Sequence, residues 1–210
     1  MLGFVTGLTA EARLLVGIDA LAVAGGGTPD GVFDAARRLV EQGATALISF
    51  GLAGGLDPAL MPGALVVPEV IVDQGTTFRC DASLVAIMGG ATVGRLTCAD
   101  KAAVTVLAKA RLYRATGAAA IDLESAGVAR AAQMCGVPFA VMRAVVDPAW
   151  RDLPPAAQVA LDASGRIALR QVIGSIVRQP GQISSLLKLA TDAAAARRTL
   201  RQQVALRFLA

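Results

Sequence analysis

Histidine is absent from this 210-residue sequence. Its absence excludes Ser-His-Asp hydrolysis, Cys-His proteolysis and metal sites built on imidazole. Acid–base chemistry must therefore use carboxylates, lysine, tyrosine or cysteine. Cysteine is also scarce, and the three residues Cys80, Cys98 and Cys135 are odd in number and widely spaced. This pattern argues against a disulfide framework or a zinc knuckle and favours the reduced cytosol.

Aromatic residues make up only 4 % of the chain and charged residues 17 %, with a net charge of +4. The basic residues are scattered until the C-terminus and do not alternate with aromatics, so no nucleic-acid partner is expected. The chain has no run of about 18 apolar residues, and its N-terminus lacks the pattern of a signal peptide. We therefore expect a cytoplasmic protein without a membrane-spanning helix.

Hydrophobic residues are abundant at 55 % and can fill the core of one domain. Apolar runs that end in glycine alternate with segments of helical spacing. This alternation predicts an α/β fold: a single domain with a mainly parallel, mixed sheet and helices on both faces. Strands are expected at 1–7, 18–27, 44–51, 64–73, 94–100, 118–124 and 137–147, and helices at 9–17, 28–43, 101–117, 125–136 and within 154–179.

Local signals refine this pattern. Thr9 is a candidate N-cap for the first helix. The segment 52–63 is rich in glycine and proline and predicts a loop, and Pro68 predicts a break or bulge in its strand. The compact domain is expected to cover residues 1–181, followed by a basic, amphipathic helical tail at 182–210.

Ligands bind at the carboxyl ends of the strands in such sheets. The apolar segment 121–150 carries acidic residues at both borders: Asp122 and Glu124 before its helix, and Asp147 after its strand. From the residues alone, Glu124 is typical of a first-turn acid favoured by the helix dipole, and Asp147 of an Asp-Pro turn. Carboxylates buried alone are costly, so these acids are expected at a cleft where a ligand partners them.

Three segments, in order, resemble the nucleoside phosphorylase and nucleosidase superfamily. They are "FVTGLTAEARLL" from Phe4, "ISFGLAGGLDPALMPGALVVPEVI" from Ile48 and "AIDLESAGVARAAQMCGVPFAVMRAVVDPA" from Ala120. The likeness covers most of residues 1–178 and implies a nucleoside phosphorylase-like fold. Two branches are most similar: the methylthioadenosine/S-adenosylhomocysteine nucleosidases and the hopanoid-associated phosphorylases. The second branch implies release of adenine from adenosylhopane, by phosphorolysis or hydrolysis.

The resemblance also implies roles for individual residues. Asp147 matches the general acid that acts on the leaving base, and Glu11 falls at the carboxylate that orients the attacking water. Glu124 matches the residue that grips the ribose hydroxyls, since a carboxylate accepts two O–H donors at once. Leu123 would lie beside the sugar.

The remaining implied positions form two groups. The region of the nucleophile, water or phosphate, would comprise Gly7, Gly26, Gly51, Leu52 and Arg143, and the base pocket Gly54, Ala102, Asp122 and Val146. Leu52 replaces the family's serine, so phosphate affinity from a side chain is lost, although the backbone of Gly51–Gly55 could still form an anion nest. Ala102 replaces the aromatic residue that stacks on adenine, which leaves Phe78 as an alternative.

No metal or organic cofactor is implied, and phosphate stays open as a co-substrate. The implied partner is a small-molecule or lipid-linked adenine nucleoside, bound by a homo-oligomer. Two alternatives to the hopanoid substrate remain: a methylthioadenosine/S-adenosylhomocysteine nucleosidase, and a non-catalytic nucleoside-binding member of the same fold. The tail at 182–210 either packs on the domain or a second subunit, or lies peripherally on the inner face of a membrane.

Overall fold

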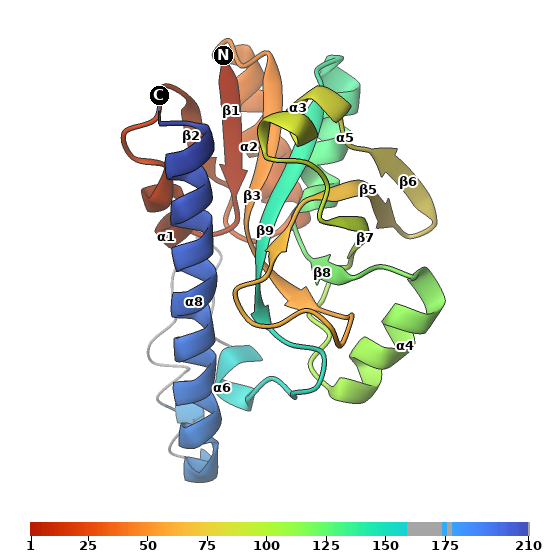
Figure 1. Cartoon of the computed structure of the whole chain (residues 1–210), viewed down its shortest axis with the longest axis vertical. Coiled ribbons are helices and arrows are strands. Elements are labelled where there is room, and N and C mark those ends of the chain that lie inside the picture. Colours follow the sequence, from red (N-terminus) through yellow and green to blue (C-terminus); the bar gives the residue numbers. More distant parts are fainter. Residues whose placement is uncertain (159–173, 176–177, 210) are drawn as a thin grey trace.

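A nine-stranded sheet forms the centre of the computed structural model, which describes residues 1–158, 174–175 and 178–209 (Figure 1). Within these residues the strand order is β2-β1-β3-β8-β7-β5-β6, and β9 pairs with both β3 and β4. The strands are β1 (Leu2–Thr6), β2 (Leu21–Ala24), β3 (Ala46–Gly55), β4 (Leu65–Val66), β5 (Pro68–Asp73), β6 (Thr76–Arg79), β7 (Val93–Cys98), β8 (Ala120–Asp122) and β9 (Phe139–Asp147).

The pairing is mixed but mainly parallel, as the sequence predicts. β1 pairs in parallel with β2 and β3, β3 with β9, and β7 with β5 and β8. The antiparallel pairs are β3 with β8, β4 with β9, and β5 with β6. β3 is the central strand, because its first part pairs with β9 and its last two residues, Gly54 and Gly55, pair with β8.

Helices cover both faces of the sheet, which confirms the predicted layering (Figure 1). Successive residues of β1 point to opposite faces: Gly3 approaches Leu39 of α2, whereas Phe4 stacks edge-on against Phe208 at the end of α8. The helices and 3-10 turns are α1 (Thr9–Ala12), η1 (Arg13–Leu15), α2 (Pro29–Glu41), α3 (Ala82–Ile87), α4 (Val106–Thr116), α5 (Ser125–Cys135), α6 (Pro155–Gln158), η2 (Pro180–Gln182) and α8 (Ile183–Arg207).

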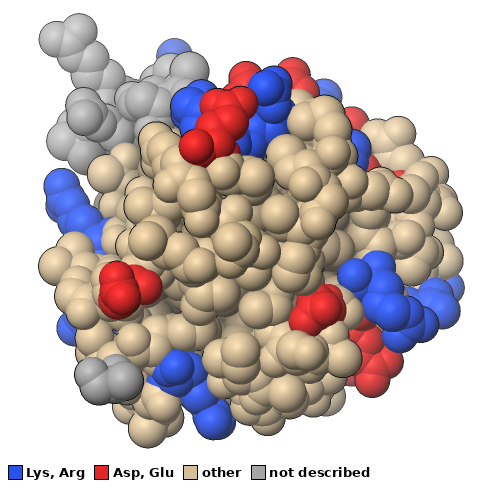
Figure 2. Space-filling view, turned by 90° about the horizontal axis from the view of Figure 1, so that it is seen from above, with Lys and Arg blue, Asp and Glu red and all other residues tan. Residues whose placement is uncertain are grey.

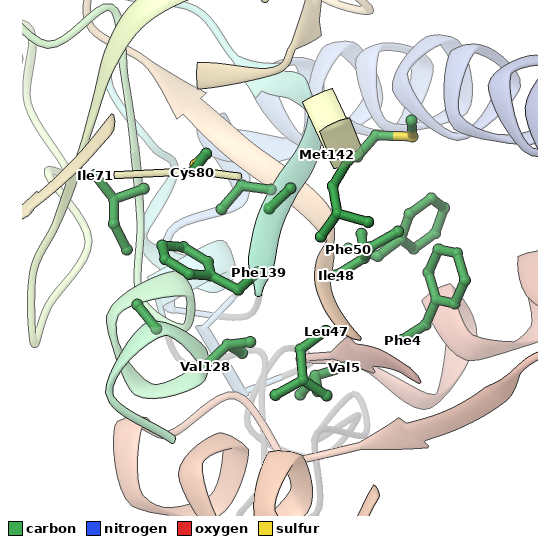
Figure 3. Close-up of a cluster of buried hydrophobic side chains, with 14 of the residues drawn as sticks. Phe4, Val5, Leu47, Ile48, Phe50, Ile71, Cys80, Val128, Phe139 and Met142 are labelled. Carbon is green, nitrogen blue, oxygen red and sulfur yellow. The ribbon is translucent and has the colours of Figure 1, made fainter. Parts of the chain in front are cut away.

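The core is built from aliphatic residues with few aromatics (Figure 3). Phe4, Leu47, Ile48 and Met142, from β1, β3 and β9, are almost completely buried there. Small residues bring α5 close to α2: a Cβ on Gly127 would lie 2.5 Å from the carbonyl oxygen of Pro29. A core with few aromatic side chains therefore fills its volume by close approach of the backbones.

The structure corrects several predicted boundaries. β3 continues through Gly55 instead of ending at Gly51, so the first part of the expected loop 52–63 is strand, stabilised by its pairing with β8 and β9. Thr9 is the first residue of α1, and Leu8 is the N-cap. The predicted break at Pro68, in contrast, is confirmed: β4 ends at Val66 and β5 begins at Pro68, and the first residue of a strand is a position that proline tolerates.

The segment 75–100 contains two elements that the sequence pattern did not predict, β6 and α3. The helix expected at 101–117 begins only at Val106, because the Thr105 side chain accepts a hydrogen bond from the N–H of Ala108 and caps it. Of the helices expected within 154–179, α6 is observed, and residues 159–173 and 176–177 lie outside the described part of the chain.

Helix α8 is the main element of the predicted tail and packs along β9 (Figure 1). Ala196, Leu200 and Val204, four residues apart, are buried against the domain, and the Thr199 hydroxyl donates to the carbonyl of Gly63 at 2.7 Å. The inner side of this helix therefore packs on the domain. Among the described helices, α8 included, none has the length and apolar character that crossing a membrane requires.

Charged side chains are sparse on the face at the amino ends of β1 and β3 (Figure 2). Side chains of both signs are present there, and broad areas of uncharged surface lie between the charged groups. This distribution matches the low charged fraction of the sequence.

Truncation of Leu200 tests the packing of α8. Leu200→Ala should lower the free energy of unfolding by about 2–5 kcal/mol, because it opens a cavity in a fully buried site. Leu206→Ala, on the same helix but 71 % exposed, is the matched control and should change it by less than about 0.5 kcal/mol. Urea denaturation measures both values, and equal effects would contradict the observed packing.

Candidate active site

A cavity of about 220 Å³ lies at the carboxyl ends of β1, β3, β8 and β9. Three carboxylates from different elements border it: Glu11 of α1, Glu124 after β8, and Asp147 at the end of β9. The two acidic borders of the segment 121–150 therefore face one cavity. Its other lining residues are Leu8, Leu52, Ala53, Gly54, Ala102, Ala103, Ile121, Asp122, Leu123, Val146 and Leu153.

Glu11 is buried and held by the backbone of two strand ends. Its carboxylate accepts hydrogen bonds from the N–H of Leu8 and the N–H of Leu52, both at 2.9 Å. Burial raises the pKa of Glu11, while the Arg143 charge and the backbone donors oppose that rise. The side chain of Glu11 is thus fixed between the ends of β1 and β3, where it lines the cavity.

Two glycines allow these carboxylates to approach the strands. A Cβ on Gly7 would lie 2.5 Å from Oε1 of Glu124. A Cβ on Gly51 would lie 2.6 Å from both Nη1 of Arg143 and Oε1 of Glu11. Glycine at these two positions leaves space for a neighbouring charged side chain. Any larger residue would displace that side chain.

Arg143 of β9 is the buried cation of this side of the cavity, with an exposed fraction of 1 %. Its Nε lies 2.8 Å from Oδ2 of Asp122, and its Nη2 lies 3.3 Å from Oε2 of Glu124. Nη2 also donates to the hydroxyl of Ser49 at 2.7 Å, and Nη1 to the carbonyl of Leu52 at 3.4 Å. Arg143 does not line the cavity; it lies behind the carboxylates that do.

Asp122 is engaged by internal partners. Besides Arg143, its carboxylate accepts from the hydroxyl and N–H of Ser125 and from the thiol of Cys98. Asp122 therefore borders the cavity, but its oxygens already accept hydrogen bonds within the protein. The resemblance implied a place for Asp122 in the base pocket. Its contacts instead join it to the Arg143 side of the site.

Glu124 shows the electrostatic consequence of this grouping. Burial is the largest cause that raises the pKa of Glu124 to about 7, and the nearby Asp122 and Glu11 add to the rise, although Arg143 opposes it. A single guanidinium thus faces three carboxylates, and Glu124 takes up a proton near neutrality. A hydroxyl-bearing ligand suits such a group, because the group can accept or donate a hydrogen bond.

Asp147 lies on the opposite side and pairs with a lysine. Its Oδ2 is 2.6 Å from Nζ of Lys109, which is fully buried in α4. Its Oδ1 is buried and has no hydrogen-bond partner within the described part of the chain. Burial raises the pKa of Asp147, and the Lys109 ammonium opposes that rise. Lys109 was not predicted as a site residue, because a lysine in a helix of mixed composition is ordinarily exposed.

The other predicted positions are distributed unevenly. Leu52, Gly54, Ala102, Leu123 and Val146 line the cavity, whereas Gly26 lies in the turn between β2 and α2 and does not. Phe78, the alternative for stacking on the base, lies on β6 and borders a separate cavity of about 670 Å³.

The predicted anion nest at Gly51–Gly55 is corrected as well. These residues form strand and pair with β9 and β8, so their backbone groups are largely engaged in the sheet. The N–H of Leu52 donates to Glu11. The carboxylate of the protein's own side chain thus occupies the position that the nest would have offered to an anion.

The fold and the cavity define an α/β protein with an acidic small-molecule site at the carboxyl ends of its central strands. The chain belongs to the phosphorylase superfamily, whose family model matches residues 20–174. This membership confirms the resemblance seen in the sequence. A search of curated proteins finds no match.

Solved structures share the fold over nearly the whole chain. An S-adenosylhomocysteine nucleosidase from Streptococcus pyogenes has a TM-score of 0.68 at 17 % identity, with 97 % of this chain and 95 % of that one covered. A methylthioadenosine/S-adenosylhomocysteine nucleosidase from Colwellia psychrerythraea, solved with adenine, gives 0.67 at 17 %, covering 96 % and 94 %. The futalosine hydrolase of Helicobacter pylori gives 0.67 at 15 %, covering 97 % and 96 %.

The raised pKa of Glu124 predicts a pH-dependent stability. Because the folded state holds this proton up to about pH 7 and the unfolded state only to about 4.5, the stabilisation is complete below pH 4.5. It is lost as the pH rises through 7. Glu124→Gln should remove roughly 1–3 kcal/mol of that fall in the free energy of unfolding.

Urea denaturation of both proteins between pH 4.5 and 8 measures the difference. Glu41→Gln, an exposed glutamate on α2, is the control and should keep the pH dependence of the original protein. Identical pH dependence in the Glu124→Gln variant and the original protein would refute the assignment of this proton to Glu124.

Proposed function

We propose that this protein hydrolyses the N-glycosidic bond of an adenine nucleoside with a large 5′ substituent and releases adenine. The observation that carries the proposal is the convergence of Glu11, Glu124 and Asp147 on one cavity. Cleavage of this bond has three requirements: the sugar must be held, the departing base neutralised and the nucleophile placed. The three carboxylates lie on different walls and can divide these tasks.

In the proposed reaction, the bond between C1′ and the base nitrogen breaks, and its electron pair leaves with adenine. Asp147 donates a proton to the base through Oδ1, the oxygen that accepts no hydrogen bond from the described residues. Glu124 binds the ribose hydroxyls, with Leu123 beside the sugar. Water attacks C1′ and gives its proton to Glu11, whose two backbone donors favour the ionised form.

Water is favoured over phosphate by the charges around the cavity. Its titratable lining residues, among those described, are all carboxylates. Arg143 forms ion pairs with Asp122 and Glu124 and donates hydrogen bonds to Ser49 and Leu52. A phosphate dianion would be repelled by Glu11, and no cation among the described lining residues of the cavity would offset that repulsion. The amide of Leu52, which could bind an anion, already binds Glu11.

The apolar part of the lining supports the proposal for the substrate. Leu8, Leu52, Ala103 and Leu153 offer no polar side-chain atom to a ligand. Such walls suit an apolar substituent on the nucleoside, since burial of apolar surface is the main favourable contribution. A hopanoid nucleoside such as adenosylhopane is the specific proposal, based on the sequence resemblance, and methylthioadenosine is the smaller alternative.

Substitution of the two proposed proton-transfer residues tests the reaction. Asp147→Asn and Glu11→Gln should each lower the rate of adenine release about 10²–10⁴-fold, because neither amide can donate or accept the required proton. Release of adenine from 5′-substituted adenosines, followed by chromatography, measures the rate. Asp34→Asn and Glu41→Gln, exposed residues of α2, are matched controls and should keep the original rate.

Full activity in Asp147→Asn would contradict its role as the acid. Folded protein that binds nucleosides but releases no adenine from any of them would favour the non-catalytic alternative.

The choice of nucleophile is tested separately. Because the described cavity walls supply carboxylates and no free cation, adenine release should proceed without phosphate and produce the free sugar. Addition of phosphate should change the rate by less than about twofold, since the described lining residues offer it no cationic binding site. Strict phosphate dependence, with a sugar 1-phosphate as product, would overturn hydrolysis and leave the glycosidic cleavage intact.

A further inference from the structure

Lys109 is the buried charge that the three-carboxylate scheme does not use. It lies on α4 with no exposed surface, and its ammonium donates to three acceptors. These are Oδ2 of Asp147 at 2.6 Å, the carbonyl of Pro148 at 2.8 Å and the carbonyl of Arg151 at 2.7 Å. An ammonium has three N–H donors, so all are occupied and none is left for a ligand.

The three contacts restrain one end of the site. The two carbonyls belong to the segment directly after β9, so Lys109 ties that segment to α4. The contact with Oδ2 restricts rotation of the Asp147 carboxyl group. As a result Oδ1, to which none of the residues that the structure describes donates, is the oxygen left for a ligand at the cavity that Asp147 lines.

We propose that Lys109 is a positioning residue: it holds Oδ2 of Asp147 so that Oδ1 faces the base, and it sets the pH range in which Asp147 carries its proton. This inference rests on the proposed function, in which Asp147 is the acid. Lys109 does not touch the substrate, and its effect passes through Asp147.

The surrounding charges make Lys109 the main control of Asp147. Lys109 is the largest influence that lowers the pKa of Asp147 against the effect of burial. The other charged groups near the pair are Arg151, Asp152 and Asp192. Arg151 forms an ion pair with Asp192, and Asp152 accepts from the N–H of Val106 at 2.7 Å. Removal of the Lys109 charge should therefore raise the pKa of Asp147.

The role of Asp147 as an acid determines the direction in which the pH dependence of activity should shift. An acid works while it is protonated, so activity falls as the pH rises through its pKa. Without Lys109 the carboxyl group keeps its proton to higher pH, and the alkaline fall of activity should move upward. A purely structural lysine would lower stability or rate equally at every pH and would leave that midpoint unchanged.

Lys109→Met tests this inference, because methionine has a similar length and no charge. The alkaline midpoint of kcat should rise by about one pH unit or more, and kcat at its optimum should fall about 10–100-fold through loss of orientation. KM should change much less. Lys188→Met, an exposed lysine of α8, is the matched control and should change neither quantity.

A double substitution separates the two proposals. Lys109→Met should cause no further loss of kcat in an Asp147→Asn background, since its effect passes through Asp147. If Asp147→Asn stops adenine release but Lys109→Met leaves the alkaline midpoint unchanged, the proposed function stands and the inference about Lys109 is overturned. An independent, additive loss in the double variant overturns it as well.

A measurement without substrate keeps the inference testable if no nucleoside is cleaved, which would be a failure of the proposed function. The ¹³Cγ resonance of Asp147, assigned by its absence in Asp147→Asn, should titrate at higher pH in Lys109→Met than in the original protein. If Lys109→Met does not fold, the ¹⁵Nζ resonance of Lys109 in the original protein should respond to the titration of Asp147. Independent titration of the two groups overturns the inference.

Discussion

The ion-pair network around Arg143 is the interaction on which the site depends. One buried guanidinium joins Asp122 and Glu124 from the end of β8 to β9, and its charge also acts on Glu11 from α1. A charge buried without partners is strongly unfavourable, so each of these groups requires the others. The sheet supplies the geometry because β1, β3 and β9 run in parallel and end at the same edge, where β8 pairs antiparallel with the last two residues of β3. Loss of Arg143 would leave several carboxylates uncompensated in the interior.

The two buried cations divide the acids of the cavity into two sets with different properties. Arg143 stays charged at any physiological pH and lies beside Glu11 and Glu124, the residues proposed for the nucleophile and the sugar. Lys109 carries a charge whose stability depends on its partner, since burial lowers its pKa and Asp147 raises it. A lysine can lose its proton whereas an arginine cannot, so the charge beside Asp147 is variable and the charge beside Glu124 is fixed. This difference agrees with the separate tasks proposed for Asp147 and Glu124.

The fold class could be predicted from the sequence because its signals are local. Apolar runs ending in glycine and helices with spacing near 3.6 residues predicted the α/β alternation. The errors occurred where pairing with distant strands overrode local preference. Residues 52–55 looked like the start of a loop, but pairing with β8 and β9 makes them part of a strand. β6 and α3 were missed because 75–100 contains only short elements with weak periodicity.

The sequence by itself determined which chemistry is available: without histidine, only carboxylates and a few other groups could transfer protons, and the motifs singled out Glu11, Glu124 and Asp147. The tertiary structure alone decided which of these residues meet and in what electrical environment. It buried Lys109 against Asp147, 38 residues away, turned Leu52 toward Glu11 and left Gly26 outside the cavity. The physical reason is that ionisation depends on burial and on the nearest opposite charge, and both are set by contacts between residues far apart in the chain.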